Sequence, residues 1–157
     1  MLPEAVSAPV PRTALLDVNV LVAMCWPTHE FHQLVSRRLA AIRAQGWATC
    51  PMTEAGFVRV SAQPSAKLGA SLQDAFRVLD ENRSEADHVF WPQDVSVADL
   101  TSEIRRRLIG HKQLTDALLL DLAIRKGGLF VTLDRLVRHL LPADSPHQNA
   151  IEVIPTA

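Results

Sequence analysis

Short apolar runs alternate with longer segments of helical periodicity along this chain of 157 residues. Each run is long enough for a buried strand, and the five runs span residues 13–17, 47–50, 88–91, 129–132 and 151–154. Between the runs, apolar side chains recur every three or four positions, which is the spacing of one helix face. The predicted helices span residues 28–45, 53–60, 68–82, 96–108 and 115–126. The pattern therefore predicts strands and helices in alternation.

Such alternation is typical of α/β proteins. We expect a three-layer α/β/α sandwich with a mostly parallel central sheet of four to five strands, because right-handed crossovers place helices on both faces of such a sheet. The sequence contains no internal repeat and no linker, so residues 13–157 are predicted to form one domain. Residues 1–12 are expected to be a flexible leader, since they lack the basic and apolar regions of a secretion signal.

Composition changes this picture little. The formal net charge of -1 does not indicate nucleic-acid binding, and the three arginines at positions 105–107 are expected on a solvated face rather than in an RNA groove. Apolar runs such as residues 117–120 are far too short to cross a bilayer. Cys25 and Cys50 lack the spacing of a zinc site or a disulfide framework, which indicates buried thiols and a cytoplasmic location.

Four acidic residues occupy related positions in the predicted fold. Asp17 ends the first strand, and Asp134 follows the fourth. Glu54 and Asp116 each lie at the start of a helix, directly after a threonine. Ligands of open α/β sheets bind beyond the carboxyl ends of the strands. We therefore expect the four carboxylates to converge in one crevice.

A cluster of this kind favours a divalent cation. Carboxylates packed closely together raise one another's pKa and oppose folding unless a cation lies between them. Mg²⁺ prefers oxygen ligands and needs only one or two direct carboxylates when waters and a substrate phosphate complete its shell. Taken singly, Glu54 and Asp116 would be explained as helix-start residues, and Asp17 and Asp134 as turn formers. Their shared placement is what predicts a site.

Asp17 is also consistent with a phosphoacceptor or phosphatase of the α/β class, in which it would be the nucleophile. A dehalogenase-like phosphatase usually carries a second aspartate two residues later, where this chain has Asn19. A response-regulator receiver needs a lysine on a late strand, and no lysine follows Lys126. These two features argue against the phosphoacceptor alternative.

Four blocks of sequence carry a resemblance to a known family. They read LLDVNVLVA, TEAGFVRV, GHKQLTDALLLDLA and LFVTLDR, at residues 15–23, 53–60, 110–123 and 129–135. Together they resemble the PIN-domain family, and within it the VapC toxins of bacterial toxin–antitoxin pairs. The resemblance runs in the right order over most of residues 13–135. The tail beyond Arg135 departs most from the family's pattern.

The resemblance implies an endoribonuclease that depends on Mg²⁺ or Mn²⁺, usually a homodimer, and inhibited by a small VapB-type antitoxin protein. Asp17, Glu54, Asp116 and Asp134 match the family's four acids. In such a site, metal-bound water would attack the RNA phosphodiester, with Asp17 and Asp116 as primary ligands and the other two acids as secondary ones. A PIN-like RNA-binding module without catalysis is the further alternative, but all four acids are present.

Three further residues are assigned supporting roles by the same blocks. Thr115 matches the residue that supports the metal site, and Arg59 matches the arginine after the Gly-Phe pair in one VapC subgroup. His111 lies in the third block, just before the helix of Asp116, and is a candidate for contact with a substrate phosphate.

Overall fold

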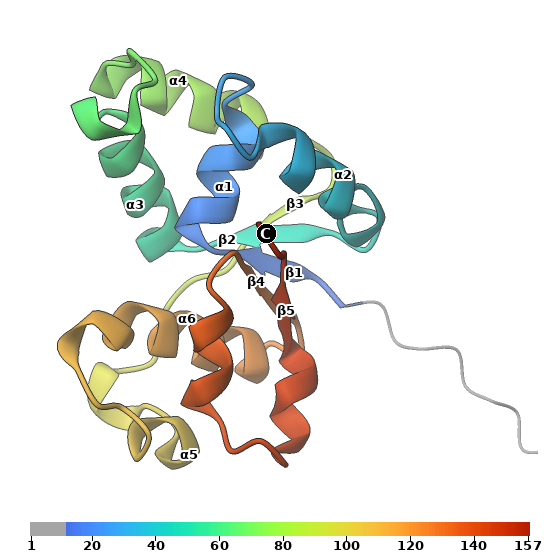
Figure 1. Ribbon diagram of the computed structural model, residues 1–157, viewed down its shortest axis with the longest axis vertical. Helices are drawn as coiled ribbons and strands as arrows, with labels where there is room; N and C mark the ends of the chain where they lie inside the picture. The colour runs from blue at the N-terminus through green and yellow to red at the C-terminus, as the bar shows by residue number, and fades with distance from the viewer. Residues whose placement is uncertain (1–11) are drawn as a thin grey trace, which may run out of the picture.

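Five strands form a single parallel sheet at the centre of the molecule (Figure 1). The structure is a computed structural model, and it describes residues 12–157. The strands are β1 (Ala14–Leu16), β2 (Trp47–Thr49), β3 (His88–Phe90), β4 (Leu129–Thr132) and β5 (Ile151–Val153). They lie in the order β3-β2-β1-β4-β5, and each pair of neighbours is parallel. The predicted central sheet is confirmed.

Helices cover both faces of this sheet, so the predicted three-layer α/β/α sandwich is also confirmed (Figure 1). One face carries α1 (Val18–Cys25), α2 (His32–Arg43), α3 (Pro51–Ser61) and α4 (Leu72–Arg83). The other carries α5 (Ser102–Arg105), α6 (Leu114–Arg125) and two 3-10 segments, Arg135–Leu140 and Pro146–Ala150. Shorter 3-10 turns span Pro64–Ala66, Val97–Asp99 and His111–Gln113.

The strand order creates one crevice at the carboxyl edge of the sheet. The chain winds from β1 to β2 and β3 on one side, and then crosses back to add β4 and β5 on the other. The direction of winding reverses between β1 and β4, and the helices that follow a reversal of this kind diverge to opposite faces. The residues that follow β1 and β4 therefore lie at the natural ligand position of the fold.

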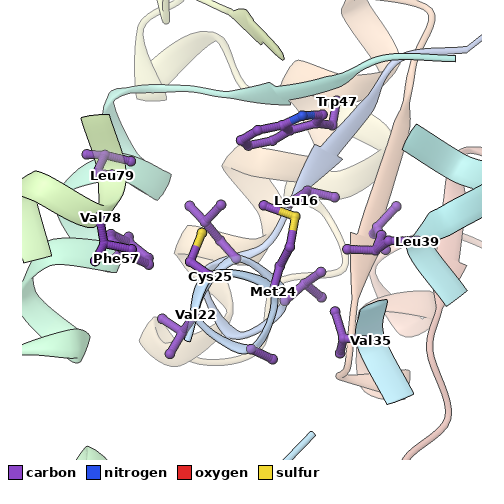
Figure 2. Close-up of a cluster of buried hydrophobic side chains, with 14 of the residues drawn as sticks. Leu16, Val22, Met24, Cys25, Val35, Leu39, Trp47, Phe57, Val78 and Leu79 are labelled. Carbon is purple, nitrogen blue, oxygen red and sulfur yellow. The ribbon is translucent and has the colours of Figure 1, made fainter. Parts of the chain in front are cut away.

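The sequence pattern did not predict α1. Six of its eight residues are buried, because the sheet and three other helices enclose it on all sides. A helix that is apolar all round shows no periodicity that a sequence pattern could reveal. Figure 2 shows three of its side chains surrounded by apolar residues of the other elements: Val22, Met24 and Cys25 of α1, with Leu16, Val35, Leu39, Trp47, Phe57, Val78 and Leu79.

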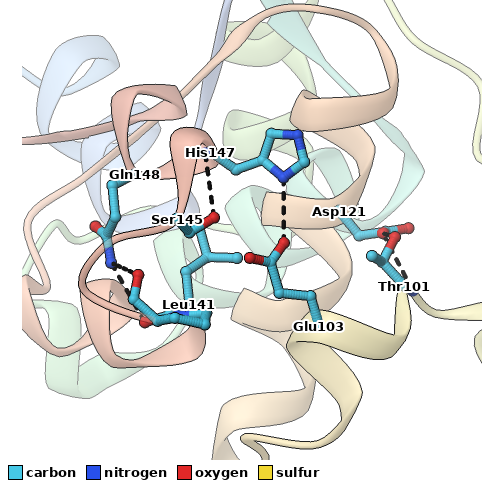
Figure 3. Close-up of polar contacts among 8 residues, drawn as sticks. Thr101, Glu103, Asp121, Leu141, Ser145, His147 and Gln148 are labelled. Carbon is cyan, nitrogen blue, oxygen red and sulfur yellow. Dashed lines mark hydrogen bonds and ion pairs between the residues drawn. The ribbon is translucent and has the colours of Figure 1, made fainter.

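Three other predicted helices were wrong in their extent. The helix expected from residue 28 begins at His32, and the helix expected from residue 68 begins at Leu72, where the Ser71 hydroxyl accepts a hydrogen bond from the Asp74 backbone at 3.0 Å. The helix expected over residues 96–108 is only a 3-10 turn followed by the short α5. It breaks because Asp121 of α6 binds both the backbone N–H and the hydroxyl of Thr101 (Figure 3).

Residues 1–11 of the predicted leader lie outside the described residues. Arg12, the last residue of that leader, donates hydrogen bonds to the carbonyl oxygens of Asn149 and Gly128, each at 2.8 Å. Cys25 and Cys50 are buried free thiols, as expected. Within residues 12–157, none of the helices combines the length and the apolarity needed to cross a bilayer.

Candidate active site

Asp17 lies at the crevice, directly after β1 and at the start of α1. Its Oδ1 accepts a hydrogen bond from the backbone N–H of Val18 at 2.7 Å, and its Oδ2 accepts one from the hydroxyl of Thr132 at 2.6 Å. Only 7% of the residue is exposed. Two donors therefore hold the carboxylate in a fixed position at the point where the sheet reverses its winding.

Thr132 also positions a second acid. Asp134 follows β4, and its backbone N–H donates to the Thr132 hydroxyl at 3.1 Å. The Asp134 carboxylate accepts from the backbone N–H of Leu136 at 2.9 Å, which fixes it at the start of the next 3-10 segment. One buried threonine hydroxyl thus connects Asp17 with the loop that carries Asp134.

Asp116 completes a group of three aspartates from the first turn of α6. Burial, together with the negative charges of Asp17 and Asp134, raises the pKa of its carboxyl group to about 7, and burial contributes most. Burial also raises the pKa of Asp17, against the hydrogen bonds from Thr132 and Val18 that lower it. The charge of Asp134 adds to the rise. The three carboxyl groups therefore repel one another across a common space.

Glu54 has a different environment. It lies in the first turn of α3, beyond the carboxyl end of β2, with its side chain 14% exposed. Its carboxylate forms an ion pair with Nε of Arg83 on α4 at 3.2 Å, and the hydroxyl of Thr49 donates to it at 3.4 Å. Burial raises the pKa of Glu54, while Arg83 lowers it. The structure thus brings three of the four predicted acids together and turns the fourth towards α4.

The three predicted supporting residues are exposed. Thr115 precedes Asp116 on α6, and its side chain forms no hydrogen bond with a carboxylate within residues 12–157. His111 begins the 3-10 turn that leads into α6. Arg59 lies on α3, beside the groove that also contains Glu54 and Arg83. Their proposed roles remain predictions.

Sequence reasoning missed two residues that fix the acids. Thr132 had a usable signal, because it ends a predicted strand and stands two positions before an acid. Arg83 had none, because only the packing of α4 against α3 brings it to Glu54.

Packing is also close between α1 and α3, where a Cβ on Gly56 would lie 2.5 Å from Cγ2 of Val18.

The donor set of the three aspartates fits a hard divalent cation. All the candidate donors are carboxylate oxygens, and a cation would remove the repulsion between them. Among the described residues, no three His, Cys, Asp or Glu side chains already stand as a complete set of metal ligands. Mg²⁺ does not require such a set, because it keeps several waters and binds one or two carboxylates together with substrate phosphates.

Comparison with known proteins finds relatives over most of the chain. The family model described as PIN domain matches residues 14–140, which include all four predicted acids. Ribonuclease VapC39 of Mycobacterium tuberculosis is 39% identical over 143 residues, covering 90% of this chain and 99% of the relative. Ribonuclease VapC38 of the same organism is 46% identical over 122 residues, covering 77% of this chain and 84% of the relative. Ribonuclease VapC44 is 40% identical over 124 residues, covering 79% and 87%.

The raised pKa of Asp116 predicts how stability depends on pH in the absence of metal. A carboxyl pKa that rises from 3.8 to about 7 on folding favours the protonated native state. Its contribution is therefore fully present below pH 3.8 and is lost as the pH rises to about 7. Asp116→Asn removes the charge, so the variant should exceed the parent in free energy of unfolding by about 1–3 kcal/mol at pH 8, with the advantage vanishing near pH 4.

Urea unfolding in EDTA at several pH values measures this difference. The expected difference in the free energy of unfolding is smaller than the roughly 4 kcal/mol that corresponds to the full pKa shift, because the Asp116 carboxyl is partly solvated. The matched control is Asp144→Asn, which changes an exposed aspartate outside the group and should follow the parent at every pH. A parent and an Asp116→Asn protein that differ by the same amount at pH 4 and pH 8 would contradict the assigned environment.

Proposed function

The chain belongs to the PIN domain family, and from this membership we propose that it is a VapC-type endoribonuclease that hydrolyses RNA phosphodiester bonds with Mg²⁺ or Mn²⁺. The observation that supports this most directly is the group of Asp17, Asp116 and Asp134 at the point where the sheet reverses its winding. The phosphoacceptor alternative and the non-catalytic module are not favoured, because the relatives are ribonucleases and the chain retains the four acids.

In this proposal the aspartates would hold the cation, and the cation would bind the scissile phosphate. A bound cation supplies charge stabilisation at the phosphate and lowers the pKa of a water. Asp17 and Asp116 would be the direct ligands, and the Thr132 hydroxyl keeps the Asp17 carboxylate in place. Asp134 and Glu54 would be secondary ligands or would hold waters of the cation. Arg83 pairs with Glu54 on the side of α4 and offsets the cost of burying its charge.

Cleavage should therefore depend on metal and on Asp17. We expect cleavage of a labelled RNA with Mg²⁺ or Mn²⁺ and its disappearance in EDTA. Asp17→Asn should reduce the rate by more than about a hundredfold, since even residues that only support a metal ligand contribute tenfold to a hundredfold. Asp144→Asn should retain the parent's rate. Full activity of the parent in EDTA would contradict the metal dependence, and full activity of Asp17→Asn would contradict the assigned site.

We further propose that a small VapB-type antitoxin protein inhibits the enzyme by binding in the groove between α3 and α4. This groove has a volume of about 780 Å³. Its apolar lining includes Leu72 and Phe76, which are 54% and 49% exposed. Arg59, Glu54 and Arg83 also line it, so an occupant would contact the ion pair that fixes Glu54.

We also propose that the enzyme is a homodimer and lies in the cytoplasm, and the free thiols support that location.

The groove can be tested through growth. Expression of the parent alone should arrest bacterial growth, and co-expression of a cognate VapB-type antitoxin should relieve the arrest. Phe76→Asp should remain toxic but no longer be relieved, because a charge would be buried against an apolar partner. Arg77→Ala, an exposed change on the same helix, is the control and should still be relieved. Relief of Phe76→Asp equal to that of the parent would place the partner elsewhere.

A further inference from the structure

A basic pocket adjoins the pocket that contains two of the aspartates. Asp116 and Asp134 line a shallow pocket of about 170 Å³ together with Lys112 and Gln113. Gln113 also lines a second pocket of about 400 Å³, whose other residues include Arg106 and Arg107. We call this second pocket, formed by Arg106, Arg107, Ile109, Gln113 and His139, the basic pocket. The two pockets meet at Gln113, so a ligand held at the aspartates can extend into the basic pocket.

The arginines of the basic pocket are held in place through one nitrogen each. Arg107 donates from Nε to the backbone oxygen of His139 at 2.8 Å, and Arg106 donates from Nε to the backbone oxygen of Ser102 at 3.2 Å. Within residues 12–157, the terminal nitrogens of both guanidinium groups form no hydrogen bond and no ion pair. They are therefore oriented but available, and guanidinium groups bind phosphate through two parallel hydrogen bonds.

Two carboxylates near α5 are already paired. Glu103 of α5 contacts Nδ1 of His147 at 3.2 Å, and Asp121 forms an ion pair with Arg125 at 2.7 Å (Figure 3 shows Glu103 with His147, and Asp121 with Thr101). The Glu103–His147 contact links α5 to the last 3-10 segment, and the hydrogen bonds from Thr101 to Asp121 link the start of α5 to α6. Among the described residues, Arg106, Arg107 and Lys112 form no ion pair within 4.0 Å, although the charge of Arg106 helps to lower the pKa of Glu103.

We propose that the basic pocket binds the phosphodiester backbone of the RNA strand next to the scissile phosphate. This proposal rests on the ribonuclease function proposed above. The carboxylates repel a polyanion until a cation neutralises them, so a nearby cationic surface is needed to hold the strand. The sequence expectation of a solvated face holds for Arg105, which donates to the backbone oxygen of Ala98 at 3.4 Å and does not line the pocket. Arg106 and Arg107 are also exposed, and in this proposal they additionally bind the RNA backbone.

The test compares two double variants with the same change in net charge. One is Arg106→Gln with Arg107→Gln, and the control is Arg105→Gln with Arg77→Gln, both outside the basic pocket. With a labelled RNA of twelve nucleotides and Mg²⁺, the pocket variant should raise KM on the order of tenfold with little change in kcat. A plot of log affinity against log salt concentration, measured in EDTA, should become shallower by about 1.4, because two phosphate contacts are lost.

A second experiment varies the length of the RNA substrate. A trinucleotide that occupies only the aspartate pocket should be cleaved equally by the parent and the pocket variant. If the pocket variant matches the control on the long RNA, the basic pocket does not bind RNA, and an equal loss on the trinucleotide would show a damaged active site instead. Should the double variant fail to fold, Arg106→Gln alone repeats the test, because Arg106 bonds only within its own segment.

These outcomes separate the two proposals. A parent that binds RNA with a salt slope reduced by the pocket variant, but cleaves nothing, would overturn the ribonuclease function and leave the pocket as an RNA-binding surface. A parent that neither binds nor cleaves RNA would overturn both.

Discussion

Mutual repulsion among three aspartates at the centre of the sheet edge is the constraint on which the rest of this structure depends. Asp17, Asp116 and Asp134 come from three separate elements, and burial and their shared charge raise the pKa of Asp17 and of Asp116. The protein offsets only part of this cost. The Val18 N–H and the Thr132 hydroxyl stabilise one carboxylate, and a backbone N–H stabilises the charge of Asp134. A divalent cation would offset the remainder. The same three carboxylates that repel one another without a cation would therefore bind the cation when it is present.

The same constraint explains the surroundings of the site. Glu54 would add a fourth negative charge, and its pairing with Arg83 keeps that charge compensated when no cation is bound. The helix that follows Asp17 is almost wholly buried, so the aspartate at its start is fixed by the core and not by a surface loop. On the opposite side, paired carboxylates leave Arg106 and Arg107 available beside the aspartates. In our proposal the negative charge of the aspartates would bind the metal, and the positive charge of the basic pocket would attract RNA.

The sequence predicted the layers, the strands and the convergence of four acids, of which the structure brings the three aspartates together. These features were predictable because each depends on local pattern. An apolar run bounded by turn residues can be recognised without knowing which strands pair with it. An acid that follows a strand of a parallel sheet must lie at the carboxyl edge of that sheet. What depended on tertiary contacts was not predictable. α1 has no polar face to reveal its period, and the break at Thr101 follows from Asp121, a residue of another helix. The pairing of Glu54 with Arg83 likewise exists only because α4 packs on α3.

The central claim is that the three aspartates form one cation site, and the most direct measurement is the melting temperature with EDTA and with Mn²⁺. A ligand that binds only the native state at a hundred times its Kd adds about 2.7 kcal/mol, which corresponds to several degrees for a chain of this size. The account predicts that shift for the parent and a much smaller one for Asp17→Asn and for Asp116→Asn, each of which should melt no lower than the parent in EDTA. Equal Mn²⁺-induced shifts in the parent and both variants would show that these aspartates hold no metal and would contradict the account.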